Sequence, residues 1–337
     1  MKKKVLIIYT GGTIGMKKTD KGYAPVAGFL GEAISAIEDM KSDGAPLWDL
    51  HEMSPLLDSS DITLKEWNKI AGVIYDNYSA YDGFVVLHGT DTMAYTASAL
   101  SFMLHGLDKP VVLTGSQIPL SEIRSDGRDN LITSLLIAAD GVANEVCLYF
   151  SGKLIRGNRA VKMSADRLVA FDSPNYPHLA DVGISIKYNY SALEKPGGKK
   201  FEMRPFRDLP IGVLKVFPGI QFSLFESIMT DKLSGIVLET FGAGNIPSDS
   251  GALIPIISRA FENGTVITVC SQCPSGTVSL GAYEASSALK AAGAVSGYDM
   301  TTEAAVAKLY HLFSLGIPKD EIKRLIERDL AGELSEL

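Results

Sequence analysis

The chain has 337 residues, of which 46% are hydrophobic and 21% charged, and this balance excludes a disordered or collagen-like protein. At roughly 100–200 residues per domain, the length predicts two domains. The 32 basic and 39 acidic residues leave a net charge of −7. Because the lysines and arginines are scattered along the chain, nucleic acid is not an expected partner.

The amino-terminal apolar run stops after about five residues at Thr10, short of the roughly 7–15 that a signal peptide needs, and is interpreted as a first strand. No stretch of the chain is apolar enough to predict a membrane span. The odd number of cysteines, Cys147, Cys270 and Cys273, does not form a disulfide framework and is typical of a reducing compartment. We therefore expect a cytoplasmic protein without a membrane partner.

Short apolar runs alternate along the chain with stretches of helical periodicity. The runs are continuously apolar, which favours a mainly parallel sheet that is covered on both faces. The predicted strands are Val5–Tyr9, Gly83–Leu87, Val111–Thr114, Glu145–Phe150, Ile211–Val216, Gly235–Leu238 and Thr265–Val269.

The clearest helix signal is a capping box that begins at Thr63 and is followed by apolar residues on one helical face. Further helices are predicted over Met93–Leu104, over Thr301–Leu315 and from Pro318 to near Leu330.

The periodic pattern breaks near Tyr188, where glycine, proline and lysine accumulate. We place a linker over residues 190–210, between a larger amino-terminal domain, residues 1–189, and a smaller carboxy-terminal α/β domain, residues 211–337. The predicted fold class is therefore α/β, with a doubly wound, mainly parallel sheet in the larger domain.

Ligands of a doubly wound sheet bind at the carboxyl ends of its strands. Three predicted strands end in small polar residues, namely Thr10–Gly15, His88–Thr92 and Thr114–Gln117. The glycine loop of the first matches neither the dinucleotide nor the P-loop fingerprint, so a nucleotide-binding protein stays a remote alternative to an ordinary loop. Its glycines would let a reactant approach the backbone, with Thr10 or Thr13 offering a hydroxyl.

Other residues near these strand ends carry possible chemistry. The polar segment Lys17–Gly22 is typical of a mobile lid, with Tyr23 at its far end. Asp91 is predicted either to cap the following helix or to act in catalysis. A threonine nucleophile needs a base within reach, and a lysine that loses its proton on burial can serve; Lys162 is one candidate.

The pair Cys270 and Cys273 has the spacing of a metal or redox site. No second pair and no spaced histidines complete a zinc site, so we interpret both as buried structural thiols. We expect neither a metal nor another cofactor.

Taken together, these segments resemble the bacterial asparaginase family, and more narrowly its type I, cytoplasmic branch. The first glycine loop and the His-Gly-Thr-Asp-Thr run are the signature regions of that family. The matching stretches, in family order, are Tyr9–Gly15, Asp58–Asp61, Leu87–Leu104, Thr114–Leu120, Arg124–Gly127, Arg156–Arg159 and Gly242–Asn245.

The resemblance implies a two-domain asparaginase-like fold with a catalytic amino-terminal domain. It implies hydrolysis of L-asparagine to L-aspartate and ammonia through a threonine acyl-enzyme. Thr13 would be the primary nucleophile, assisted by Tyr23. Thr90, Lys162 and Asp91 would form a second constellation, with lysine in the place that histidine takes in a hydroxyl, base and orienter triad.

The resemblance also implies a binding site for the substrate. Asp58, Ser59 and Ser60 match positions that bind its backbone end, with hydroxyl and backbone N–H groups for the α-carboxylate, and Asp91 would meet its α-ammonium. Backbone N–H groups near Thr90 and Gly115 would stabilise the oxyanion.

Assembly and regulation follow from the same resemblance. Asn245 matches a residue that reaches the active site of a neighbouring subunit, which implies a homodimer or homotetramer. At the second, regulatory asparagine site of type I members, Val161 replaces threonine and Glu239 replaces arginine. Because an anion repels the α-carboxylate, we predict that this regulation is weakened or absent.

Three other functions are alternatives to the hydrolysis of asparagine. Glutaminase activity, alone or beside asparaginase activity, differs by one methylene of the substrate, worth only about 1–3 kcal/mol. An amidotransferase subunit acting on tRNA is disfavoured by the acidic balance and by a first strand near the start of the chain. A non-hydrolytic amino-acid sensor would not need both hydroxyls and the lysine.

Overall fold

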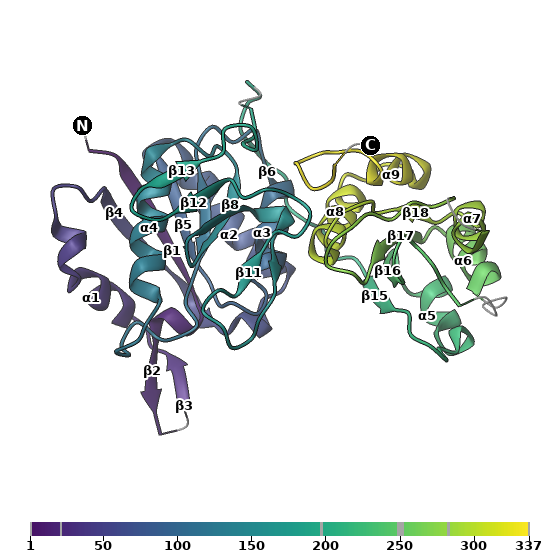
Figure 1. Cartoon of the computed structure of the whole chain (residues 1–337), viewed down its shortest axis with the longest axis horizontal. Helices are drawn as coiled ribbons and strands as arrows, with labels where there is room; N and C mark the ends of the chain where they lie inside the picture. The colour runs from purple at the N-terminus through teal and green to yellow at the C-terminus, as the bar shows by residue number, and fades with distance from the viewer. Residues whose placement is uncertain (1, 21, 196–197, 248–252, 282–283, 336–337) are drawn as a thin grey trace. The chain divides into compact units, whose positions relative to one another are not determined.

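The computed structural model describes residues 2–20, 22–195, 198–247, 253–281 and 284–335. The chain divides into two compact units, Met1–Arg204 and Pro205–Leu337 (Figure 1). The border between the units falls within the predicted linker, residues 190–210.

The first unit is built on an eight-stranded sheet with the order β13-β12-β9-β8-β7-β5-β1-β4. Neighbouring strands from β8 to β4 are parallel, whereas β9, β12 and β13 pair antiparallel, so the sheet is mainly parallel as predicted. Its strands are β1 (Lys4–Gly11), β4 (Leu47–Leu57), β5 (Gly83–Leu87), β7 (Val111–Thr114), β8 (Val146–Phe150), β9 (Lys153–Arg156), β12 (Ala180–Val182) and β13 (Ile186–Tyr188).

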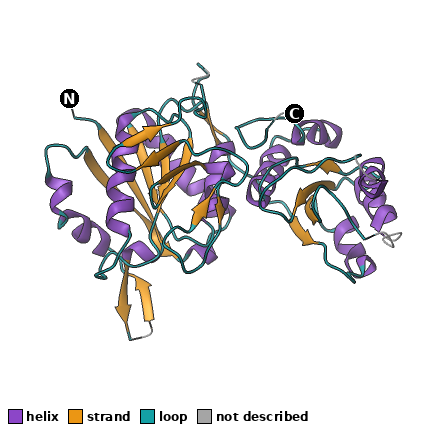
Figure 2. Ribbon diagram, viewed as in Figure 1, coloured by secondary structure: helices purple, strands orange, loops and turns teal. Residues whose placement is uncertain are grey.

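Helices lie on both sides of this sheet (Figure 2). Val5, Ile7 and Tyr9 of β1 share a buried apolar core with α1 and α4. Leu6 and Ile8 are also buried and, because side chains alternate along a strand, point to the opposite face. The helices of this unit are α1 (Phe29–Ser35), α2 (Leu64–Asn77), α3 (Met93–Met103) and α4 (Gly127–Asp140), with 3₁₀ turns η1 (Thr13–Gly15), η2 (Glu38–Lys41), η3 (Ser59–Asp61), η4 (Tyr78–Ala80) and η5 (Gly157–Arg159).

Three two-stranded pairings complete the first unit. One is a hairpin of β2 (Met16–Thr19) and β3 (Gly22–Pro25), which projects from the unit in Figure 1. The predicted lid Lys17–Gly22 therefore lies in this hairpin, apart from Lys21, which is outside the described residues. The others pair β6 (Leu104–His105) with β14 (Glu202–Met203) and β10 (Val161–Lys162) with β11 (Phe171–Asp172).

The second unit contains a parallel four-stranded sheet whose strands follow chain order. Its strands are β15 (Ile211–Lys215), β16 (Gly235–Thr240), β17 (Val266–Ser271) and β18 (Val295–Ser296), and its helices are η6 (Phe222–Phe225), α5 (Glu226–Asp231), α6 (Leu253–Glu262), α7 (Glu284–Ala291), α8 (Thr302–Ser314) and α9 (Lys319–Ile326). The last helix ends earlier than the predicted Leu330. The prediction of a larger mainly parallel domain and a smaller α/β domain is confirmed.

Two further expectations have structural outcomes. Cys147 and Cys270 are buried, but Cys273 is exposed, so the prediction of two buried thiols is wrong for Cys273, which lies beyond the end of β17. Across the described parts of the chain, no helix combines the length and apolar character needed to cross a membrane.

Candidate active site

The three polar loops singled out in the sequence start at one edge of the large sheet. β5 lies between β1 and β7, and the register aligns Tyr9 with Leu87 and Leu87 with Thr114. Because the three strands are parallel, the segments that follow them emerge side by side.

The glycine loop packs directly against the neighbouring segments. Gly12 has φ +85°, and a Cβ built on it would lie 2.4 Å from the backbone nitrogen of Gly89. Its own N–H donates to the Leu57 carbonyl at 3.1 Å. Only glycine permits this approach, which brings the loop of Thr13 against the residues preceding Thr90 and Asp58.

The two hydroxyls of this loop differ in their surroundings. Thr10 is buried, and its Oγ1 donates to the Leu87 carbonyl at 3.1 Å. Thr13 is half-buried at the start of η1, and its hydroxyl forms no hydrogen bond with any described residue. Of the two candidates left open by the sequence, Thr13 is therefore the one available to a ligand.

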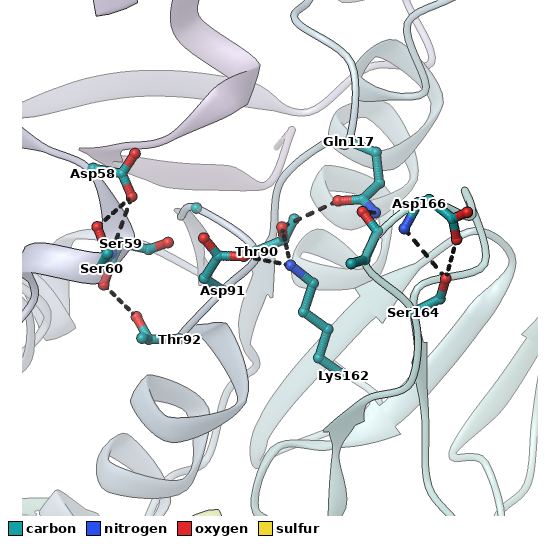
Figure 3. Close-up of polar contacts among 12 residues, drawn as sticks. Asp58, Ser59, Ser60, Thr90, Asp91, Thr92, Gln117, Lys162, Ser164 and Asp166 are labelled. Atoms are coloured by element: carbon teal, nitrogen blue, oxygen red, sulfur yellow. Dashed lines mark hydrogen bonds and ion pairs between the residues drawn. The ribbon is translucent and has the colours of Figure 1, made fainter.

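Thr90, Asp91 and Lys162 form one polar cluster (Figure 3). Lys162 Nζ donates to Thr90 Oγ1 at 2.9 Å and to the Asp91 carboxylate at 2.6 Å. The lysine side chain is 19% exposed and that of Asp91 65%. The N-cap residue of α3 is Thr92, whose side chain makes no capping hydrogen bond. Asp91 is therefore not the helix cap, and its carboxylate pairs with Lys162 instead.

Asp58, Ser59 and Ser60 lie next to this cluster at η3. Asp58 Oδ1 accepts from the backbone N–H and the hydroxyl of Ser60, both at 3.0 Å. Ser59 is buried against Gly89, since a Cβ on that glycine would lie 2.6 Å from the serine Oγ. The Ser59 carbonyl accepts from Thr92 Oγ1 at 2.7 Å, which ties η3 to the start of α3.

Two polar residues of these loops were not predicted as site residues. One is Thr92, just described. The other is Gln117, whose Oε1 accepts from Thr90 Oγ1 at 3.1 Å. Gly115, which precedes it, is buried, with its carbonyl accepting from Asn130 at 3.0 Å. Adjacency to a predicted strand end was the available signal for Gln117.

His88 stands two residues before Thr90 but is not placed to act as its base. Its ring nitrogens contact the Gly89 carbonyl at 2.7 Å and Thr96 Oγ1 at 2.9 Å. Burial lowers the pKa of His88 to about 4, against an opposing contribution from the Gly89 carbonyl. The ring is therefore neutral near pH 7 and serves to hold β5 to α3.

Tyr23 and Asn245 form no hydrogen bond with Thr90, Asp91 or Lys162 among those that the described residues make. Tyr23 is 47% exposed on β3, and its hydroxyl donates to Glu122 at 2.8 Å, which raises the pKa of the phenol. A cavity of about 410 Å³ is lined by Tyr23, Gln117 and Glu122 among others. Asn245 belongs to the second unit, where its backbone pairs with Phe241.

No group of three or more His, Cys, Asp or Glu side chains that could hold a metal ion occurs among the residues that the structure describes. The chemistry of the site is instead that of hydroxyls, one amine and carboxylates. This donor set suits acyl transfer to a hydroxyl, with the lysine in the role of proton carrier.

Two family models account for most of the chain. Residues 4–194 match the model described as "Asparaginase, N-terminal", and residues 210–326 match "Glutaminase/Asparaginase C-terminal domain". The chain belongs to the asparaginase family. The resemblance stated from the sequence motifs is therefore confirmed, and the chain is an enzyme of this family.

Individual relatives agree with this assignment. The chain is 42% identical to "L-asparaginase 1" of Escherichia coli K12, over 99% of this chain and 98% of that protein. It is 42% identical to the "60 kDa lysophospholipase" of Mus musculus, over 99% of this chain and 63% of that longer protein. The crystal structure of L-asparaginase I from Vibrio cholerae superposes with a TM-score of 0.91 at 44% identity, covering 99% of this chain and 100% of that chain.

Proposed function

We propose that this protein hydrolyses the side-chain amide of L-asparagine, giving L-aspartate and ammonia. The observation that carries the proposal is the cluster of Thr90, Lys162 and Asp91 beside the loop of Thr13. The 42% identity to a protein named L-asparaginase 1 supports the choice of substrate.

Thr13 is the proposed nucleophile of the first step. Its Oγ attacks the side-chain carbonyl carbon, the carbon–nitrogen bond breaks, and the hydroxyl proton leaves with the nitrogen as ammonia. A hydroxyl without a hydrogen-bond partner in the described structure is free to approach the substrate. Tyr23 assists this transfer once its own hydroxyl leaves Glu122.

In the second step, water attacks the ester carbon, its proton returns to the Thr13 oxygen, and aspartate is released. We assign Thr90 and Lys162 to moving the proton of this water, with Asp91 orienting the lysine. Backbone N–H groups near Thr90 and Gly115 stabilise the oxyanion in both steps, a contribution worth about 10²–10³ in rate per donor.

The substrate's charged end is the proposed source of specificity. Asp91 pairs with the α-ammonium, and Asp58, Ser59 and Ser60 bind the backbone end of the substrate, with hydroxyl and backbone N–H groups for its α-carboxylate. Asn245 of a neighbouring copy completes the site in a homodimer or homotetramer. We propose that this assembly works in the cytoplasm, with the small-molecule substrate as its partner and no cofactor.

Ammonia release from L-asparagine by the purified protein tests the reaction. Addition of hydroxylamine is expected to divert product to aspartyl hydroxamate, because a stronger nucleophile than water intercepts the ester. Thr13→Ala is expected to abolish turnover and hydroxamate formation while thermal unfolding stays as in the wild type. Thr19→Ala, on the hairpin, is the control. A folded wild-type protein that released no ammonia would overturn the proposal.

Glutamine is the competing substrate. Accommodating one more methylene in a site built for asparagine costs about 1–3 kcal/mol, so we expect kcat/KM for asparagine to exceed that for glutamine by about 10- to 200-fold. Equal values would make the protein a dual asparaginase-glutaminase. Binding of either amino acid without turnover would instead identify a sensor.

A further inference from the structure

The amide of Gln117 has only one workable orientation. Its Nε2 donates to the Arg167 carbonyl at 3.1 Å and to the Ala165 carbonyl at 3.4 Å. Carbonyl oxygens only accept hydrogen bonds, so the NH₂ end must face them. The Oε1 end therefore faces Thr90, whose hydroxyl has to be the donor of the 3.1 Å bond between them.

This orientation determines the direction of the hydrogen bonds at Thr90. The single hydroxyl hydrogen points to Gln117, and the oxygen accepts from Lys162 Nζ at 2.9 Å. Donation in the cluster runs from Lys162 to Thr90 to Gln117 (Figure 3). A proton transfer from Thr90 to the lysine requires the opposite direction, so the bond to Gln117 must break before that transfer takes place.

We infer that Gln117 is a positioning residue, which holds the Thr90 hydroxyl in its resting orientation and couples that hydroxyl to the segment of residues 164–168. The inference rests on the proposed function in assigning Thr90 to proton transfer. It adds a residue and a segment that act through Thr90.

Hydrogen bonds fix both the backbone of Gln117 and the turn of residues 164–168 that faces its amide. The Asp126 carboxylate accepts from the backbone N–H groups of Gln117, at 3.1 and 3.0 Å, and of Ile118, at 3.0 Å. On the other side, Ser164 Oγ accepts from the backbone N–H groups of Asp166 at 3.3 Å and Arg167 at 3.1 Å.

Other bonds stiffen the segment further. Ser164 Oγ donates to the Asp166 carboxylate at 2.8 Å, and Ser151 Oγ donates to the Leu168 carbonyl at 2.7 Å. The carbonyls that orient the glutamine amide are therefore presented by a structured turn. A change in that turn reaches Thr90 through the Gln117 side chain, and also through Lys162, which precedes the turn by two residues.

Two substitutions at Gln117 separate positioning from a merely structural role. Gln117→Met keeps the length but removes the acceptor, so the Thr90 hydroxyl loses its fixed position. We expect this loss to outweigh the bond that no longer has to break, and kcat to fall about tenfold with KM within twofold. Gln117→Glu keeps an acceptor oxygen for Thr90 but loses the donor to the Ala165 and Arg167 carbonyls. It adds a negative charge one hydroxyl away from Lys162, where Asp91 is the other facing carboxylate and Asp126 accepts from the Gln117 backbone. An added anion favours the charged lysine, so the acidic limb of the pH–kcat profile should move up by about one pH unit.

A loop substitution tests the coupling. Ser164→Ala is expected to lower kcat severalfold in the wild-type background and to have a smaller effect in the Gln117→Met background, because of the two paths from the turn to Thr90 only the one through Lys162 remains. Gln221→Met, an exposed glutamine of the second unit, is the matched control and should leave kcat and the pH profile unchanged.

A second readout does not depend on turnover. The rate at which cyanate carbamylates Lys162, followed by peptide mass spectrometry, reports the neutral fraction of that amine as the pH is varied. Its midpoint should rise by about one pH unit in Gln117→Glu and stay in place in Gln117→Met and Gln221→Met. A wild-type protein without asparagine hydrolysis would overturn the proposed function, while this labelling would still test the glutamine.

Several results would overturn the inference. One is an unmoved labelling midpoint in Gln117→Glu while its thermal unfolding matches the wild type. Others are wild-type kcat in Gln117→Met, a loss confined to KM, or additive losses in the double variant with Ser164→Ala. Loss of thermal stability that accounts for the whole fall in kcat would reduce Gln117 to a structural role.

Discussion

At the scale of single residues, two ion pairs of the first unit have similar geometry and different positions. Lys162 meets Asp91 at 2.6 Å, and Lys153 meets Asp172 at 2.8 Å, with lysine side chains 19% and 26% exposed. Ion pairs with this much solvent contribute about 0–1 kcal/mol to folding. Their role in stability should therefore be alike, and their role in catalysis should not.

We expect Lys162→Met to lower kcat by about 10²–10⁴-fold, because it removes the proposed proton carrier. Lys153→Met is the matched control and should keep kcat. Both variants should change the free energy of unfolding by about 1 kcal/mol or less, as followed by urea denaturation beside the ammonia assay. An equal loss of kcat in the two variants would assign the effect to the fold.

Individual residues of the site differ in how well local sequence predicts them. Thr90 and Asp91 were predictable because they adjoin each other at the end of a buried run. Lys162 was only one candidate among lysines on local sequence, since its partner Thr90 is 72 residues away along the chain. Gln117 lies in one of the polar strand-end loops, but no local pattern predicts its role, because that role depends on which carbonyls face its amide.

At the scale of elements, the junctions between strand and helix are determined by close backbone contacts. Gly12 and Gly22 both have positive φ, +85° and +109°. A Cβ on Gly12 would meet the backbone of Gly89 at 2.4 Å, whereas a Cβ on Gly22 meets nothing within 4 Å. Substitutions at these two glycines therefore separate the free-energy cost of a strained φ from that of a steric clash.

We expect Gly12→Ala to lower the free energy of unfolding by about 3 kcal/mol or more and to reduce kcat, because the glycine loop must move off Gly89. Gly22→Ala should cost only about 1 kcal/mol, from backbone strain. Thermal unfolding and the ammonia assay measure both. Similar effects of the two substitutions would contradict the close approach of the loops.

His88 at the junction of β5 and α3 predicts an acid sensitivity. Burial lowers the pKa of His88 to about 4, below the value near 6.5 of an exposed histidine, so the unfolded chain takes up the proton first as the pH falls. We expect the contribution of His88 to the free energy of unfolding to be constant above about pH 6.5 and to fall by about 3 kcal/mol as the pH falls to 4.

This decline can be isolated by urea denaturation between pH 7 and 4.5. His88→Gln should show a weaker pH dependence than the wild type over that range, even where its stability at pH 7 is lower. His51→Gln, at an exposed histidine, should follow the wild-type dependence. Parallel curves for all three proteins would show that His88 does not titrate with unfolding.

Elements with a local signal were predicted well. The box at Thr63 is a complete capping box at the start of α2, with Glu66 returning its side chain to the cap backbone. The central strands were evident as continuous apolar runs. β4 and β14, by contrast, were not predicted. β4 is an edge strand in which exposed and half-buried residues alternate only from Leu47 to Glu52, before Pro55, and β14 lies within the predicted linker.

At the scale of the whole molecule, the proposed site draws on both units. Thr13 belongs to the first unit and Asn245 to the second. In the proposed homodimer or homotetramer, Asn245 of one copy completes the active site that contains Thr13 of another copy. Such trans action can be tested by mixing two inactive variants, Thr13→Ala and Asn245→Ala.

After subunit exchange, a hybrid dimer holds one site with both wild-type residues, so activity should recover to about a quarter of the wild-type value. Size-exclusion chromatography with light scattering establishes the assembly. Action within one chain would give no recovery, because no hybrid site would contain both residues. A monomer with full activity would equally rule out the trans role.

The expected loss of regulation also belongs to this scale. The Glu239 carboxylate accepts a hydrogen bond from Thr302 Oγ1 at 2.6 Å and lies 3.9 Å from Lys215 Nζ. Both of these partners belong to the second unit. We expect hyperbolic dependence of rate on asparagine concentration, with a Hill coefficient of about 1. Sigmoidal kinetics in the wild type that became hyperbolic in Glu239→Ala would contradict this expectation.

The sequence by itself determined the α/β class, the central strands, the capped helix and the two signature loops of the asparaginase family. These features depend on neighbours within a few positions along the chain, where hydrophobic period, capping and glycine conformation are set. Only the tertiary structure decided that Asp91 pairs with Lys162, that Thr10 turns inward while Thr13 stays available, and that Gln117 accepts from Thr90. These contacts depend on which strand ends, distant along the chain, the sheet brings together, and no local sequence pattern predicts that proximity.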